Sequence, residues 1–265
     1  MMKTGFFRYA ALCLLFLMAC KKDGNDVILP QGDDDAIAIP SSKNAPGLGD
    51  NDDAPLGNLL TLPEGIRIVK RPHKRFDPNM EKLYAHVNTF YVDVNLVNDR
   101  MPGTPPVYVE FPPGLIGVSI DHDKQNGLSI EKYIIPVPPT ERIGGGRDTT
   151  TIYIGMLCLN KTRSMPWYDN GEEELRFPIS RNNYEQFLIT TDRNLLRFLQ
   201  EVKNKTKLRV SRHWNPIETA EPDYVLPEWM KIYDHINEMA WKITDGWGIT
   251  NKELREFRKA LKAFE

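Results

Sequence analysis

The sequence predicts a β-rich α+β protein, in which an antiparallel immunoglobulin-like sandwich is followed by a C-terminal pair of amphipathic helices. Two observations support this prediction. Between about residues 62 and 180, short runs rich in Val, Ile and Tyr are separated by turn residues, as in antiparallel sandwiches. From Thr191 onward, the apolar residues instead recur at helical spacing.

The clearest strand pattern covers residues 90–96. Phe90, Val92, Val94 and Leu96 alternate with polar residues, apart from Tyr91, and therefore lie on one face of a strand. The other strand candidates are punctuated by Pro, Gly and Asn residues that favour turns. They cover residues 107–111, 115–120, 128–137 and 151–159.

The helical part covers about residues 191–265. Thr191 or Asp192 caps a first helix, and residues 207–210 return as a short strand. The final pair of helices begins at Pro227 and at Thr250. A stripe of apolar residues runs along the first of these, and Glu253 completes a capping box with Thr250 at the second.

The N-terminal residues carry a targeting pattern. Lys3 and Arg8 precede an apolar run over residues 10–18, and Leu17-Met18-Ala19-Cys20 follows. The run is shorter than the roughly 20 residues needed to span a bilayer. This pattern resembles the lipobox of bacterial lipoproteins. The resemblance implies that residues 1–19 are a signal peptide, and that Cys20 becomes the acylated (palmitate-bearing) N-terminus and the membrane anchor.

Residues 20–61 have the composition of an acidic, Pro- and Gly-rich tether, which predicts a disordered spacer before a domain at residues 62–265. Lys21-Lys22-Asp23 resembles the surface-export signals of some outer-membrane lipoproteins. It therefore favours a location on the outside of the bacterial outer membrane. A structural lipoprotein facing the periplasm is the alternative.

Composition excludes several kinds of protein. The formal net charge of −2 gives no general case for a nucleic-acid partner. Once Cys13 and Cys20 are assigned to the leader and the lipid, only Cys158 remains, so no internal disulfide forms. No phosphate-binding loop, dinucleotide fingerprint, nucleophile elbow or zinc-ligand spacing is present. We therefore predict no cofactor, no metal and no catalytic residue.

Two polar segments allow two interpretations each. Residues 121–127 are either a calcium loop or, as we favour because Lys132 stands where a closing glutamate belongs, a solvated turn. His122 and its neighbouring carboxylates support the alternative of a hydrolase acting on envelope polymers. The lysines at 203, 205 and 207, with Arg209, predict either a protected edge strand or a basic face for acidic glycans or anionic lipid.

Aromatic residues are concentrated in the second half of the chain. Those in loop-like segments are candidates for stacking on a glycan, because core packing does not already account for them. These candidates are Trp167, Tyr168, Trp214 and Trp247.

Two further motifs occur together. One comprises Phe111-Pro112-Pro113-Gly114-Leu115, Gln125-Asn126-Gly127-Leu128 and Met156-Leu157-Cys158-Leu159-Asn160; the other runs from Ile236 to Asp245. Together they resemble bacterial extracellular thioester domains and their thioester-lacking relatives. In that family a strand cysteine and a helix glutamine condense to a thioester that captures host amines. Cys158 matches the cysteine, but Asn237 stands at the glutamine position. We therefore expect no thioester here, and a non-enzymatic binding or adhesion module for a glycan or protein ligand.

Overall fold

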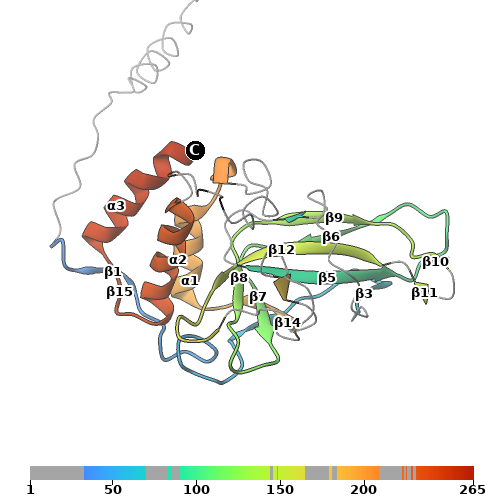
Figure 1. Ribbon diagram of the computed structural model, residues 1–265, viewed down its shortest axis with the longest axis horizontal. Helices are drawn as coiled ribbons and strands as arrows, with labels where there is room; N and C mark the ends of the chain where they lie inside the picture. The colour runs from blue at the N-terminus through green and yellow to red at the C-terminus, as the bar shows by residue number, and fades with distance from the viewer. Residues whose placement is uncertain are drawn as a thin grey trace, which may run out of the picture. The chain divides into compact units, whose positions relative to one another are not determined.

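The two longest strands form the centre of the fold. β5 (Phe90–Asn98) and β12 (Thr150–Cys158) pair antiparallel over seven residues. The computed structural model describes residues 33–69, 83–84, 90–143, 146–147, 149–164, 179–180, 184–208, 223, 225, 228 and 231–265 (Figure 1). The chain divides into two units, Met1–Asp34 and Asp35–Glu265, and every helix and strand that the structure describes belongs to the second.

β12 joins two parts of a nine-stranded sheet. Its residues Thr150–Met156 pair with β5, whereas Leu157 and Cys158 pair with β8 (Gly127–Ser129). Antiparallel strands continue from β8 and form a curled half-barrel: β7 (Leu115–Ser119), β14 (Tyr184–Thr190) and β2 (Gly57–Leu59). Three short strands flank β5 and β12: β3 (Ile66–Ile68), β4 (Leu83–Tyr84) and β13 (Ile179–Ser180).

A separate antiparallel ribbon pairs β6 (Val107–Phe111) with β9 (Tyr133–Val137). Alternate residues of both strands are buried, as period-two alternation requires. The buried ones share one apolar cluster with Phe90, Val92, Val94 and Leu96 of β5, so the predicted apolar face of that strand is confirmed. β10 (Arg142–Ile143) and β11 (Gly146–Arg147) form a further small pair.

Three helices gather at one end of the long strands (Figure 1). They are α1 (Arg193–Val202), α2 (Lys231–Thr244) and α3 (Asn251–Leu261). Their apolar faces form a second cluster with the opposite faces of β5, β7, β8 and β12. β5 is therefore buried on both sides, which explains why Tyr91 interrupts its alternation: it packs into the helical cluster.

Both predicted helix caps are confirmed. Asp192 accepts hydrogen bonds from the backbone N–H groups of Asn194 (3.0 Å) and Leu195 (2.8 Å). At α3, the Thr250 and Glu253 side chains each bond the other's backbone N–H, which completes the capping box. The β-rich class, the antiparallel sheets and the C-terminal helices are thus confirmed, while the immunoglobulin-like topology stays a prediction.

Three local predictions are wrong. The single strand predicted at 128–137 is two strands, β8 and β9, separated by a turn at residues 130–132. Residues Thr206–Leu208 form the 3-10 helix η2 rather than the start of a strand. The rest of that predicted strand, and Pro227, lie outside the described residues.

The third error concerns the tether, because the described residues from Asp35 to Leu60 belong to the folded unit. β1 (Ile37–Pro40) pairs antiparallel with β15 (Gly248–Thr250), and β2 pairs with β14. Leu48 is 2% exposed and packs with the helices. The apolar residues of this segment are too few and too widely spaced to make a pattern of their own, but Ile39 and Leu48 are buried against distant elements.

Candidate functional site

The loop after β1, from Ser41 to Asp53, is fixed by two buried asparagines. Asn160 donates from Nδ2 to the carbonyl oxygens of Gly47 (3.1 Å) and Gly49 (2.8 Å). Asn126 donates from Nδ2 to the same Gly47 oxygen (3.0 Å) and from its backbone to Asn160 Oδ1 (2.8 Å). Buried polar groups are costly when unpaired, so these mutually satisfied bonds hold the loop in one conformation.

Two glycines let this loop approach its surroundings closely. Gly47 and Gly49 have φ angles of 72° and 55°, in the left-handed region. A Cβ on Gly47 would lie 2.3 Å from Pro55 Cγ, and one on Gly49 would lie 2.6 Å from the carbonyl oxygen of Thr244. Since Thr244 is the last residue of α2, glycine at position 49 brings the loop against the end of that helix.

Asp245, directly after α2, forms the opposite wall. Its Oδ1 accepts from the backbone N–H of Lys161 (2.9 Å) and its Oδ2 accepts from the Thr244 hydroxyl (2.5 Å). Burial, assisted by repulsion from Asp50, raises the pKa of Asp245, although these two hydrogen bonds oppose the shift. The carboxyl group is therefore oriented by neighbours and partly withdrawn from water.

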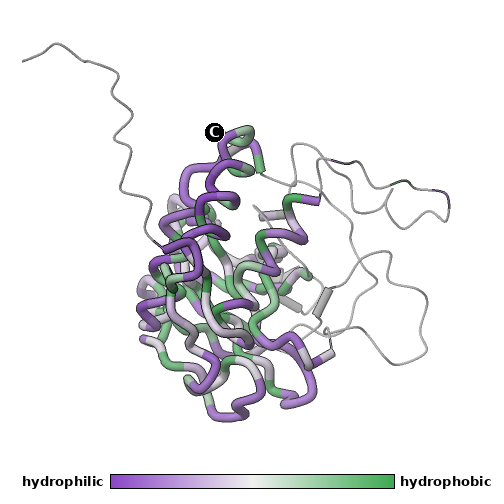
Figure 2. The backbone as a smooth tube through the Cα atoms, turned by 90° about the vertical axis from the view of Figure 1, so that its left-hand side faces the viewer, coloured by the Kyte–Doolittle hydropathy of each residue, from purple (hydrophilic) through white to green (hydrophobic). Residues whose placement is uncertain are grey.

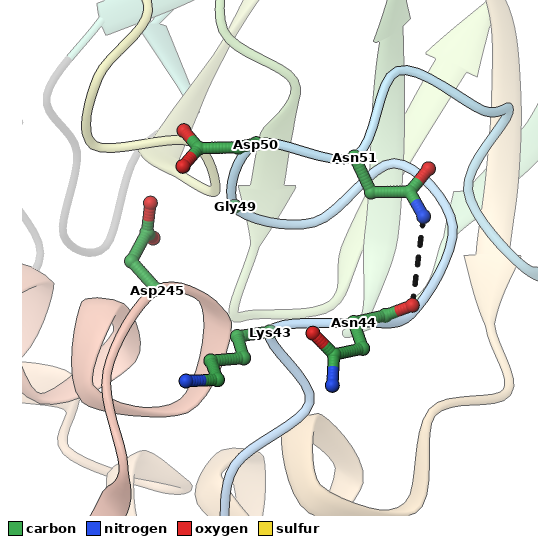
Figure 3. Close-up of a pocket in the computed structure, with 6 residues that line it drawn as sticks. All are labelled: Lys43, Asn44, Gly49, Asp50, Asn51 and Asp245. Atoms are coloured by element: carbon green, nitrogen blue, oxygen red, sulfur yellow. Dashed lines mark hydrogen bonds between the residues drawn. The ribbon is translucent and has the colours of Figure 1, made fainter.

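A polar pocket of about 420 Å³ lies between the loop and the end of α2. In Figure 3 the carboxylates of Asp50 and Asp245 point toward one another from opposite walls. The Thr162 hydroxyl donates to Asp50 Oδ1 (2.6 Å), which orients this second carboxylate. The pocket is lined by Lys43, Asn44, Gly49, Asp50, Asn51 and Asp245. Carboxylates, carboxamides and an ammonium group thus offer hydrogen-bond donors and acceptors in one small volume.

Trp247 follows Asp245 by two residues and lies against Lys43, which lines the pocket. It is 81% exposed, the most solvent-accessible tryptophan among those whose surroundings the structure describes. The Lys43 ammonium lies over its ring, 3.4 Å from the centroid. An aromatic face, held in place by a lysine that also lines the pocket, therefore adjoins the polar groups.

Of the aromatic residues that the sequence singles out, the structure describes only Trp247. Trp167, Tyr168 and Trp214 lie outside the described residues, as does the predicted lipid attachment site, Cys20. Among the described helices, none is both long and apolar enough to cross a membrane.

The structure brings Cys158 and Asn237 together. Asn237 Oδ1 accepts a hydrogen bond from the backbone N–H of Cys158 (2.9 Å), and this bond joins α2 to β12. Both residues are buried, at 4% exposure for Asn237 and none for Cys158. Cys158 belongs to the apolar cluster between the β-layers, so its thiol occupies the position of a small core residue.

Tyr184 lies beside this pair. Its hydroxyl donates to the backbone carbonyl of Gln125 (2.5 Å). Burial raises the pKa of Tyr184 well above its ordinary value, and the nearby Cys158 adds to the shift. Tyr184 is therefore a neutral phenol at physiological pH, and it supplies neither a base nor a charge to the thiol.

Within residues 121–127, Asp121 to Lys124 form a turn closed by its own hydrogen bonds, and Gly127 begins β8. The backbone N–H of Asp123 donates to Asp121 Oδ1 (3.0 Å), and that of Lys124 donates to the Asp121 carbonyl (3.0 Å). Among the residues that the structure describes, no three His, Cys, Asp or Glu side chains are grouped to hold a metal ion.

Five of the six residues that line the pocket could not be singled out from the sequence, because the segment from Lys43 to Asn51 has the composition of a tether. Lys43, Asp50 and Asp245 are brought together only by the pairing of β1 with β15 and by the asparagine network. One signal was available: the sequence Pro46-Gly47-Leu48-Gly49 places an apolar residue between two glycines, which is typical of a tight, anchored turn.

Comparisons with models of known protein families, with curated proteins and with solved structures each found no significant match. The functional argument therefore depends on the residues of this chain.

Proposed function

We propose that this chain is a lipid-anchored protein of the bacterial envelope whose immunoglobulin-like domain is a non-enzymatic binding module for a carbohydrate. The observation that supports the ligand class is the pocket lined by Asp50 and Asp245, together with the exposed Trp247 that contacts its lining residue Lys43. The lipid anchor is argued from the lipobox-like residues 17–20 alone.

A sugar fits this arrangement chemically. Each sugar hydroxyl both donates and accepts hydrogen bonds, and the pocket offers carboxylate acceptors together with the two-sided carboxamides of Asn44 and Asn51. The apolar face of a sugar ring packs on an aromatic ring, and an indole supplies a large flat surface. The loop and Asp245 are already held by hydrogen bonds, so binding costs little further ordering of the protein.

Trp247→Ala tests the site. We expect this variant to lose about fivefold or more in affinity for the glycans that the wild type binds on an array, because stacking on an aromatic contributes on the order of 1 kcal/mol. Tyr108→Ala is the matched control, since Tyr108 is a 66% exposed aromatic on β6. Equal binding by the wild type and the Trp247 variant, or equal losses in both variants, would exclude the proposed site.

One observation favours a hydrolase as a second candidate. Two carboxylates face each other across the pocket, and the pKa of one of them, Asp245, is raised. Glycoside hydrolysis uses such a pair as acid and base or nucleophile. Incubation with envelope and host polysaccharides decides between the two: release of reducing ends that disappears in Asp245→Asn would establish an enzyme and overturn the binding-module proposal.

The thioester alternative has a separate test. Asn237 is one methylene shorter than glutamine, and its carbonyl bonds the backbone of Cys158. We expect the intact mass of residues 21–265, which lack the lipid anchor, to equal that of their unmodified sequence. A mass lower by one ammonia, which rises by one methylamine when that amine opens the thioester, would instead identify a covalent adhesin.

A further inference from the structure

The helical end of the protein carries a concentration of positive charge. Residues 193–208 and 251–265 contain ten Lys and Arg against four Asp and Glu, a formal charge of +6 in a chain whose total is −2. Figure 2 shows hydrophilic residues along most of the helix that ends at the C-terminus. The sequence had indicated this charge around residue 205 but placed it on a strand.

Five lysines form what we call the basic cluster: Lys203, Lys205, Lys207, Lys259 and Lys262. Lys205 pairs with Glu265, and η2 lies against η6 (Lys262–Phe264). Because η2 lies against η6, Lys207 and Lys262 stand on neighbouring turns of the chain. The hydrogen bond and the attraction from Lys205 lower the pKa of Glu265, and attraction from Lys262 and Lys207 adds to this. All members except Lys205 are exposed.

The folded unit begins beside this helical end. Ile37 of β1 pairs with Thr250, and the N–H of Asn251, the first residue of α3, donates to the Ala36 carbonyl (2.9 Å). Only fifteen residues, 21–35, separate Ala36 from Cys20. A fully extended chain of that length spans no more than about 54 Å. α3, with its eleven residues, is about 16 Å long. A domain anchored at Cys20 therefore has the basic cluster within reach of the bilayer surface.

We propose that the basic cluster docks on the anionic phospholipid headgroups of the membrane that holds the lipid anchor. This inference rests on the anchoring at Cys20 that forms part of the proposed function. Asp35 precedes Ala36, which lies at the N-terminal end of α3, and a carboxylate near a helix N-terminus interacts favourably with the helix dipole. Lys259 and Lys262 lie toward the other end of the helix, away from this carboxylate. Membrane anchoring by lipid is stable when a second signal such as a polybasic patch accompanies the acyl chain.

The test uses residues 21–265, which lack the anchor but contain both apolar clusters of the folded unit. We expect this protein to cosediment with vesicles of phosphatidylcholine mixed with phosphatidylglycerol, but not with phosphatidylcholine alone, and to be released by salt. Each basic residue near an anionic surface strengthens binding about fivefold. Lys207→Glu/Lys262→Glu should therefore weaken cosedimentation at least about tenfold.

The matched control is Arg100→Glu/Lys132→Glu, which makes the same change in net charge at exposed positions of the β-layers. Absence of binding to the anionic vesicles, an equal loss in the control, or preference for a soluble oligonucleotide would each overturn the inference. The lipid anchor is tested separately, by incorporation of labelled palmitate into the full chain in cells. The two tests are independent because the vesicle assay contains no acylated protein.

Discussion

The pocket and the basic cluster differ both in the sign of their charge and in the interactions that hold them in place. Residues 33–53, which include the pocket loop, carry six Asp and one Lys, and buried side-chain amides of Asn126 and Asn160 hold that loop in place. The helical end is basic and is held by apolar packing, such as the stacked rings of Phe198 and Phe257, 6.1 Å apart. The overall charge of −2 therefore conceals two oppositely charged regions, and composition alone is a poor guide to what each one binds.

The largest effect on stability is expected at the helical end. Phe257→Ala removes a fully buried ring that contacts both Phe198 and His235. Truncations of this kind leave a cavity and cost about 3–5 kcal/mol in the free energy of unfolding. Urea unfolding followed by circular dichroism measures the change. A loss below about 1 kcal/mol would contradict apolar packing as the main support of this end.

Asn160→Ala tests the polar support of the pocket. It leaves the Gly49 carbonyl and the Asn126 N–H without their side-chain partner, which should cost about 2–4 kcal/mol because both groups stay buried. We also expect faster hydrogen exchange in the loop from Ser41 to Asp53. Asn44→Ala is the control, since Asn44 is exposed and contributes its backbone carbonyl, not its side chain, to the hydrogen bond with Asn51, and it should change stability by less than about 0.5 kcal/mol.

The smallest effect is a dependence on pH. The pKa of Asp245 is raised in the folded state, so the folded state binds this proton more tightly than the unfolded state does. This carboxyl therefore lowers stability once it ionises above its folded pKa, and the penalty disappears as the pH falls toward the unfolded pKa. Asp245→Asn should gain stability relative to the wild type as the pH rises from acid to neutral. A constant difference between the two proteins across that range would show that ionisation of Asp245 is not destabilising.

The pattern of long elements was predictable from the sequence, whereas their junctions were not. β5, β6, β7 and β12 fall where alternation and composition indicate, and Asp192 and Thr250 cap the helices as expected, because these features depend on neighbours in the sequence. The proximity of Asn237 and Cys158 was indicated by a resemblance and not by any local pattern. The pocket could not be predicted from the sequence. Asp50 and Asp245 are brought together by a three-residue strand pair and by two buried asparagines, and none of these contacts is between neighbours in the sequence.

The pairing of β1 with β15 has a mechanical consequence. The pocket loop follows β1 directly, and Trp247 precedes β15 directly, so both walls of the pocket continue into the same strand pair. In a chain anchored through Cys20, a pull from a bound ligand would pass from the pocket to β1 and out to the tether. Ile39 of β1 and Ile249 of β15 belong to the helical apolar cluster, so the pull would load this cluster together with the hydrogen bonds of the strand pair. The apolar cluster between the β-layers contains no residue of β1 or β15 and would stay unloaded.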